Sequence, residues 1–162
     1  MTNAEPRPIE LLSPAKDLAC GIEAIRHGAD AVYIGAPRFS ARAAAGNTTD
    51  DIRALCDYAH LFGARVYVAL NTILKEEELK EAERIIHRLY EAGADALITQ
   101  DMAIATMDLP PIPLHASTQM DNRTPEKVRF LQDVGFTQVV LARELSLEQI
   151  REIARRTTVP LE

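Results

Sequence analysis

A short phrase recurs along this chain and constrains its fold more than any other feature: an apolar helix end, a glycine, and then a buried strand. The two clearest copies run from Arg26 to Gly35 and from Tyr90 to Thr99, and looser copies run from Leu61 to Asn71 and from Gly135 to Arg143. Glycine readily adopts the left-handed conformation that ends many helices, so each copy marks the end of a helix and the start of a strand. The chain is therefore predicted to be a series of βα units.

The spacing of apolar residues between these copies predicts strands that alternate with helices. Strands are expected at residues 9–13, where Pro14 would end the strand, and at 31–35, 65–71, 96–100, 114–118 and 138–142, with a seventh strand beginning at 159–161. Helices are expected at 17–27, from Thr48 or Thr49, after the acidic residues 76–78, from Thr124 and from Ser146, with a short helical turn at 102–107. Strands connected in this way need right-handed crossovers, which produce a parallel sheet covered by helices. A TIM-barrel-like α/β fold is the first choice, and an open doubly wound sheet is the alternative.

The length of the chain conflicts with a complete barrel. An eight-stranded barrel typically needs about 250 residues, whereas this chain has 162 residues and reaches only the start of a seventh strand. We therefore expect residues 1–162 to form a single incomplete domain, a parallel βα repeat truncated at strand seven. The missing strands would leave sheet edges open, and open edges favour self-association.

Charge and hydropathy exclude several classes of protein. The net charge of −6 and the pI near 5.3 argue against a broad surface for polyanions, because affinity for a phosphate backbone comes from clustered Lys and Arg. No apolar stretch approaches the length of a membrane span, and the first eight residues lack the apolar core of a signal peptide. We expect a cytoplasmic protein that makes no contact with a membrane.

The two cysteines, Cys20 and Cys56, lie within helical patterns and have no CxxC spacing. They are predicted to be small buried packing residues in a reducing compartment. No metal site and no cofactor are expected within this chain.

Polar residues on the interior face of the strands are the candidates for a binding site. Active sites of parallel barrels lie at the carboxyl ends of the strands, where alternate residues point inward. In the fifth strand, His115, Ser117 and Gln119 share one polar face, which we expect to line the interior. The same phasing places Tyr33, Tyr67 and Asn71 inside and makes Arg143 a candidate on the sixth strand. Glu10 is a further candidate for an interior carboxylate, and Glu162 would be the first contribution of the seventh strand. For Glu10, Tyr33 and Tyr67, hydrogen bonding that fixes the core is the favoured alternative.

Two further features near this face have the residue types of a reactive or binding site. His115 and Ser117 are two residues apart on a strand, a spacing of roughly 6 to 7 Å, which is too long for a direct bond between a nucleophile and its base. Arg42, in the loop after the second strand, is a fixed cation suited to a carboxylate or a phosphate. A surface role is equally compatible with Arg42.

Several motifs, in the same order along the chain, resemble the N-terminal region of the collagenase-like peptidase family, U32. The resemblance rests on residues 10–15 (ELLSPA), 28–35 (GADAVYIG), 39–42 (FSAR), 66–72 (VYVALNT), 115–119 (HASTQ) and 140–146 (VLARELS). It covers nearly the whole chain from Ile9 to Glu162.

This resemblance implies a barrel-type domain from bacterial proteins that are regarded as proteases. Relatives in the family include proteins implicated in hydroxylating tRNA, ribosomal RNA or ubiquinone precursors, some of which carry iron–sulfur clusters. The cysteine-bearing segment typical of the family follows the position of Glu162, and Cys20 and Cys56 do not match it. An iron–sulfur cluster is therefore expected only in a longer protein.

Three functions remain open at this point. The first is a peptidase that acts on a peptide substrate, and the second is an RNA or ubiquinone-precursor hydroxylation factor that acts through the longer protein. The third is a non-catalytic assembly domain. The chain alone is expected to be inactive, and its catalytic residues are unknown. The resemblance and the barrel phasing together select these residues as candidates for substrate binding: Arg42, Asn71, His115, Gln119, Arg143 and Glu144.

Overall fold

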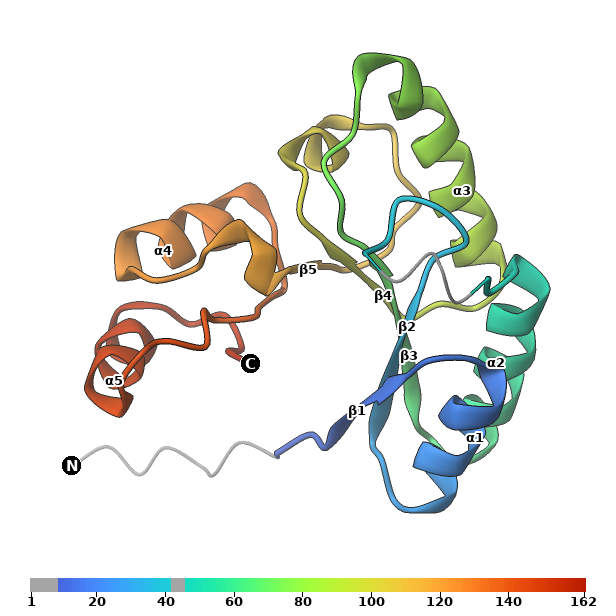
Figure 1. The fold of residues 1–162 in the computed structure, drawn as a ribbon. Coiled ribbons are helices and arrows are strands. Elements are labelled where there is room, and N and C mark those ends of the chain that lie inside the picture. The colour runs from blue at the N-terminus through green and yellow to red at the C-terminus, as the bar shows by residue number, and fades with distance from the viewer. Residues whose placement is uncertain (1–8, 42–45) are drawn as a thin grey trace.

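A computed structural model of the chain describes residues 9–41 and 46–162, which form a curved sheet of parallel strands alternating with helices (Figure 1). The strands are β1 (Leu12–Ala15), β2 (Ala31–Gly35), β3 (Arg65–Leu70), β4 (Ala96–Thr99), β5 (Leu114–Ala116) and β6 (Gln138–Val139). The α-helices are α1 (Leu18–Arg26), α2 (Thr49–Leu61), α3 (Leu79–Glu91), α4 (Pro125–Val134) and α5 (Leu147–Arg156). The described residues also form the 3₁₀ turns η2 (Glu76–Glu78), η3 (Met102–Thr106) and η4 (Thr118–Met120).

The order of the strands confirms the TIM-barrel-like prediction. Each strand pairs in parallel with the next one along the chain, from β1 to β6. A doubly wound sheet reverses its strand order near the middle, so the sequential order rules out that alternative. Leu161 also forms a parallel bridge with Val139, where the seventh strand was expected to begin.

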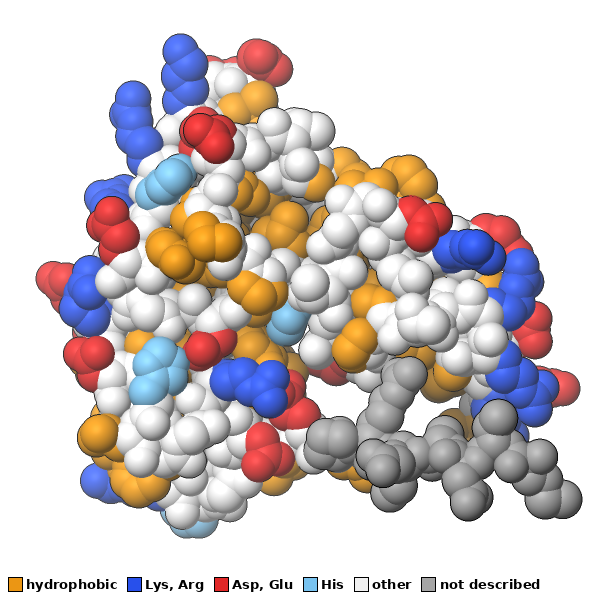
Figure 2. Space-filling model, turned by 180° about the vertical axis from the view of Figure 1, so that it is seen from behind, with side chains coloured by type: hydrophobic (Ala, Val, Ile, Leu, Met, Phe, Trp, Pro, Cys, Tyr) orange, Lys and Arg blue, Asp and Glu red, His pale blue; other side chains and the backbone are white. Residues whose placement is uncertain are grey.

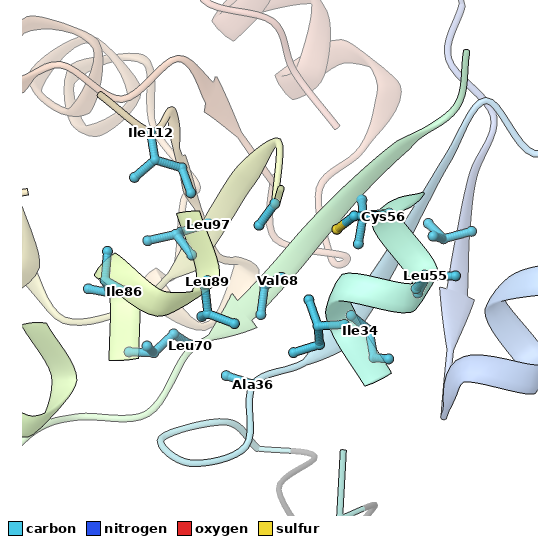
Figure 3. Packing of buried hydrophobic residues seen from close by; sticks show 14 of the residues in the cluster. Ile34, Ala36, Leu55, Cys56, Val68, Leu70, Ile86, Leu89, Leu97 and Ile112 are labelled. Carbon is cyan, nitrogen blue, oxygen red and sulfur yellow. The ribbon is translucent and has the colours of Figure 1, made fainter. Parts of the chain in front are cut away.

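Helices cover the outer face of the sheet and bury most of the apolar side chains. In Figure 1, α1, α2 and α3 lie along one face of the first four strands. Figure 3 shows Ile34, Val68 and Leu97 of the sheet packed among Leu55 of α2 and Leu89 of α3, and all five are fully buried. Burial of such a side chain contributes roughly 1.5 to 3 kcal/mol, so this layer holds the helices on the sheet. A second cluster joins β5 and β6 to α4 and α5.

The inner face of the sheet carries a smaller cluster of alternate residues. Ala31, Tyr67, Ala69, Ala96 and Ile98 are buried there. The side chains of Leu12 and Tyr33 pack against them. The predicted phasing of Tyr33 and Tyr67 toward the interior is therefore confirmed.

The recurring glycine phrase also ties neighbouring strands together. The glycine in each of the two clear copies has a positive φ, 93° and 94°. The aspartate two residues later then accepts a backbone hydrogen bond from the strand next to its own: Asp30 from the Leu11 amide at 2.8 Å, and Asp95 from the Val66 amide at 2.7 Å. The phrase therefore ends a helix and anchors the start of a strand, a role that the glycine argument alone did not predict.

Two local predictions were wrong. Pro14 does not end the first strand but lies within β1, which is compatible with proline because β1 has a single neighbour in the sheet. Cys20 is exposed, whereas Cys56 is buried as predicted. The buried stripe of α1 runs through Gly21, where an added Cβ would lie only 2.7 Å from Leu55 Cδ1, so Cys20 falls beside the contact between α1 and α2.

Candidate functional site

A cavity of about 820 Å³ lies at the carboxyl ends of the strands, where the barrel phasing predicted a site. It brings together four of the six predicted residues: Asn71, Gln119, Arg143 and Glu144. Part of its lining is apolar and comes from the inner face of the sheet, including Tyr33, Ala69 and Ile98. Arg42 lies outside the described residues, and His115 does not line this cavity.

Asn71 joins the end of β3 to the loop that follows β2. Its side-chain Oδ1 accepts a hydrogen bond from the Ala41 amide at 3.1 Å. One residue further on, the Thr72 amide donates to the carbonyl oxygen of Phe39 at 3.1 Å. Phe39 is buried in a left-handed conformation, with φ of 59° and the Arg38 guanidinium 4.8 Å from its ring centroid. These contacts hold the loop at the rim of the cavity.

Ser117 and Gln119 are positioned by the η4 turn. Ser117 is the N-terminal cap of this turn, and its hydroxyl oxygen accepts from the Gln119 amide at 3.2 Å. The turn ends the strand after Ala116, so Gln119 reaches the rim and does not continue the strand face. Since Ser117 acts as a cap and His115 Nδ1 is buried without a hydrogen bond, the two residues do not form a pair of nucleophile and base.

Asn122 is a buried support for this rim that the sequence analysis missed. Its amide nitrogen donates to the carbonyl oxygens of Ser117 at 2.9 Å and Val140 at 2.8 Å. It therefore ties the segment after β5 to the segment after β6. The only sequence signal was a polar residue in a loop on the active face, and its partner Val140 lies 18 positions away.

Charged residues line the mouth of the cavity. Arg123, which was not predicted, pairs with Asp121 and with Glu144, the latter at 3.4 Å. Arg143 is exposed and has no hydrogen bond or ion pair among the described residues. Glu144 is thus engaged by a neighbouring arginine, whereas the guanidinium of Arg143 remains available to an anionic group of a ligand.

His115 belongs to a polar network deeper inside the half-barrel. Its ring meets the edge of the Tyr67 ring with centroids 4.7 Å apart, and only 6% of its surface is exposed. Burial, together with the charge of Arg65, lowers the pKa of His115 to about 4, so the ring is neutral at pH 7. The Tyr67 hydroxyl donates to Glu10 Oε2 at 2.8 Å, and Arg65 pairs with the same oxygen at 3.3 Å.

Glu162 lies near this network at the other end of the described chain. Gln138 Nε2 donates to Glu162 Oε2 at 2.9 Å. Burial of the carboxyl group, with a smaller effect from the charge of Glu10, raises the pKa of Glu162. A second cavity of about 680 Å³ opens here, at the amino ends of the strands, and is lined in part by Glu10, Arg65, Gln138 and Glu162.

The cysteines offer no cluster site within the described part of the chain. Burial raises the pKa of the Cys56 thiol to about 12, whereas Cys20 is exposed on another helix. No three His, Cys, Asp or Glu side chains among residues 9–41 and 46–162 gather into a group that could hold a metal ion. An iron–sulfur cluster in a longer protein stays a prediction.

Within the residues that the structure describes, no helix is both long and apolar enough to cross a bilayer.

The fold and the cavity define a class of protein: a TIM-barrel-like domain with a binding site at the carboxyl ends of its parallel strands. Comparison with known proteins agrees, since the model of peptidase family U32 matches residues 16–162. The chain belongs to peptidase family U32.

Curated relatives carry different descriptions within this family. The 23S rRNA 5-hydroxycytidine C2501 synthase of Escherichia coli is 59% identical over 154 residues, which are 95% of this chain and 24% of the relative. The tRNA hydroxylation protein P of E. coli is 38% identical over 155 residues, 93% of this chain and 34% of that protein. An uncharacterized protease of Methanocaldococcus jannaschii is 39% identical over 149 residues, 90% of this chain and 36% of that protein. The chain thus spans from about a quarter to just over a third of the length of these relatives.

Solved structures support the fold. The U32 peptidase Mk0906 superposes with a TM-score of 0.75 over 99% of this chain and 70% of that chain, at 12% identity. Thiamine phosphate pyrophosphorylase from Pyrococcus furiosus reaches a TM-score of 0.65 over 93% of this chain and 71% of that chain, at 15% identity. At such low identities the likeness concerns the fold alone.

Proposed function

We propose that this chain supplies the substrate-facing part of a barrel in an enzyme that hydroxylates a cytidine of ribosomal RNA. The observation that carries the proposal is the 59% identity, over 95% of the chain, with the E. coli 23S rRNA 5-hydroxycytidine synthase. The aligned 154 residues make up 95% of the chain, so nearly all of the barrel segment described above lies within the match. The groups that carry out the oxidation and the rest of the RNA-binding surface would belong to the longer protein. An enzyme that acts on ribosomal RNA would work in the cytoplasm.

The shape of the cavity suits a nucleoside base. Its volume of about 820 Å³ lies within the range of small-molecule pockets. Enzymes that modify a base take it out of its stack and hold it between apolar or aromatic surfaces while polar groups read its edge. The apolar side chains of Tyr33, Ala69 and Ile98 would contact the faces of the base, and Asn71 and Gln119 would provide polar groups at the rim.

The charge distribution limits what this chain does for RNA binding. Its net charge is −6, and on the face shown in Figure 2 Lys and Arg are interspersed with Asp and Glu and do not form one basic patch. Arg143 at the mouth of the cavity would contact a phosphate beside the target nucleotide. The larger part of the affinity for RNA would come from a basic surface elsewhere in the longer protein.

A chimera provides the test. The aligned segment of the E. coli synthase is replaced by this chain, and the chimera is expressed in an E. coli strain that lacks the synthase. Nucleoside mass spectrometry of 23S rRNA should then detect restored 5-hydroxycytidine. Arg143→Ala should lower the modified fraction roughly 10-fold or more, because a charge-assisted bond to phosphate is lost. Arg129→Ala, an exposed arginine on α4 away from the cavity, is the matched control and should have no effect. A soluble chimera that leaves C2501 unmodified would refute the proposal.

A peptidase is the second candidate, supported by the 39% identity with the M. jannaschii protein described as an uncharacterized protease. The described residues provide no bonded pair of Ser117 and His115 for this chemistry. The longer protein, purified with reductant and metal, would be incubated with collagen-like and unstructured peptides. Absence of cleavage in both would remove the peptidase hypothesis.

A further inference from the structure

We propose that Asn71 is a fixed hydrogen-bond donor that reads the acceptor edge of the target base, so that the site selects cytosine over uracil. This inference rests on the proposed function and adds to it the polarity of base recognition. The starting point is the Asn71 amide, whose Oδ1 lies 3.1 Å from the Ala41 amide nitrogen. A backbone N–H can only donate, so the Asn71 atom facing Ala41 must be the oxygen.

The same contact determines where the amide nitrogen points. With Oδ1 bound to the rim loop, the NH₂ group lies on the other branch of the amide. Among the described residues it has no hydrogen bond, although Asn71 lines the cavity. The loop that carries Ala41 is also held in place, because its Phe39 carbonyl oxygen accepts a hydrogen bond from the Thr72 amide at 3.1 Å. A rotation that let this loop accept a hydrogen bond from the Asn71 NH₂ group would have to break that bond. The free part of Asn71 is therefore a donor with a set orientation.

A fixed donor distinguishes the two RNA pyrimidines at one position. Cytosine presents acceptors at O2 and at N3, whereas uracil carries an N–H at N3. A donor placed toward N3 would bond to cytosine and would meet another donor in uracil, leaving both groups unpaired. Sites built around one polar partner reject a base that cannot supply it more strongly than apolar pockets reject a change of size.

Asn71→Asp separates this role from the role of tethering the loop. A carboxylate oxygen can still accept from the Ala41 amide, so the rim loop keeps its anchor, but the side chain can no longer donate. Binding of cytidine 5′-monophosphate and of uridine 5′-monophosphate to the purified chimera would be measured by calorimetry. Both ligands carry the same phosphate, so the added negative charge cancels in the ratio of their affinities. Ile73→Asp, which adds a carboxylate at an exposed position two residues along the chain that does not line this cavity, is the matched control.

The parent chimera and Ile73→Asp should prefer cytidine monophosphate, and Asn71→Asp should lower that preference roughly 10-fold or reverse it. An unchanged ratio in Asn71→Asp would overturn the inference, as would equal affinity of the parent chimera for the two nucleotides. The result is independent of hydroxylation. A chimera that fails to modify 23S rRNA but shows the Asn71-dependent ratio of affinities refutes the proposed reaction and supports the recognition role of Asn71. A chimera that modifies 23S rRNA but shows an unchanged ratio supports the reaction and refutes the recognition role.

Discussion

His115 should make the stability of this fold depend on pH in a way that can be measured directly. Its pKa in the folded chain is lowered to about 4 by burial and by the charge of Arg65. In the unfolded chain the pKa should be about 6.5. As the pH falls below 6.5, the unfolded state takes up a proton that the folded state does not take up until about pH 4. The free energy of unfolding should therefore decrease across this window.

The two pKa values give the size of the effect. Across the whole window the loss is about 3 kcal/mol, because each pKa unit corresponds to about 1.4 kcal/mol. Most of the loss, about 2 kcal/mol, should occur between pH 7 and pH 5. This is a substantial part of the 5 to 15 kcal/mol that stabilises a typical domain.

Urea unfolding of the chain and of His115→Gln at pH 7 and pH 5 would measure this loss. The variant should lose about 2 kcal/mol less than the parent chain over this interval, whatever its stability at pH 7. Titrations of other groups, such as Glu162, are present in both proteins and cancel in the comparison. In parallel, a pH titration followed by NMR of the four histidine rings would measure the pKa of His115 itself. The His115 signal is identified as the one that is missing from the spectrum of His115→Gln.

Two outcomes would refute this reasoning. One is an NMR titration of His115 with a midpoint near 6.5, which would mean that the ring is hydrated or paired in the folded state. The other is an identical change in unfolding free energy for the two proteins between pH 7 and pH 5.

Two further predictions concern packing and the strand anchors. Gly21→Ala should reduce the free energy of unfolding by about 1 to 3 kcal/mol, because its Cβ would lie 2.7 Å from Leu55 Cδ1, whereas Cys20→Ala on the exposed side of α1 should change it little. Equal midpoints of urea denaturation for the two variants would contradict this. Asp95→Ala should cost about 1 to 3 kcal/mol, because the Val66 amide loses its carboxylate acceptor. The amide of Val66 should also exchange faster with deuterium, and unchanged protection there would contradict the anchoring role.

Local features of the fold were predictable because their partners are close in the sequence. Caps were expected at Thr48 or Thr49 and at Ser146, and in the structure Thr48 and Ser146 each bind the residue three positions later, Asp51 and Gln149. The alternation of glycine-ended helices with short apolar strands was sufficient to predict a parallel βα repeat, whereas the strand order in the structure decided between a barrel and a doubly wound sheet. The family resemblance added the candidate residues at the strand ends, and the cavity brings together Asn71, Gln119, Arg143 and Glu144.

Contacts between distant residues were not predictable in the same way. The sequence places Asp95 in a helix-to-strand connection, yet its carboxylate binds the amide of Val66, a strand residue 29 positions earlier. Asn122 and Arg123 carried no pattern that marked them as rim residues. Their roles depend on segments that the sheet brings together. The spacing of residue types along the sequence therefore does not indicate these roles.

The strand around His115 shows most clearly which features follow from the sequence and which follow only from the tertiary structure. The sequence determined that a strand begins near Leu114 with His115 on its interior face, because side chains alternate along an extended backbone, but its prediction that Ser117 and Gln119 continue that face was wrong. Tertiary structure separated them: the strand ends at Ala116, Ser117 caps η4, Gln119 reaches the cavity and His115 packs on Tyr67. Alternation is a property of the backbone, whereas the point at which a strand ends depends on the hydrogen bonds that neighbouring segments offer.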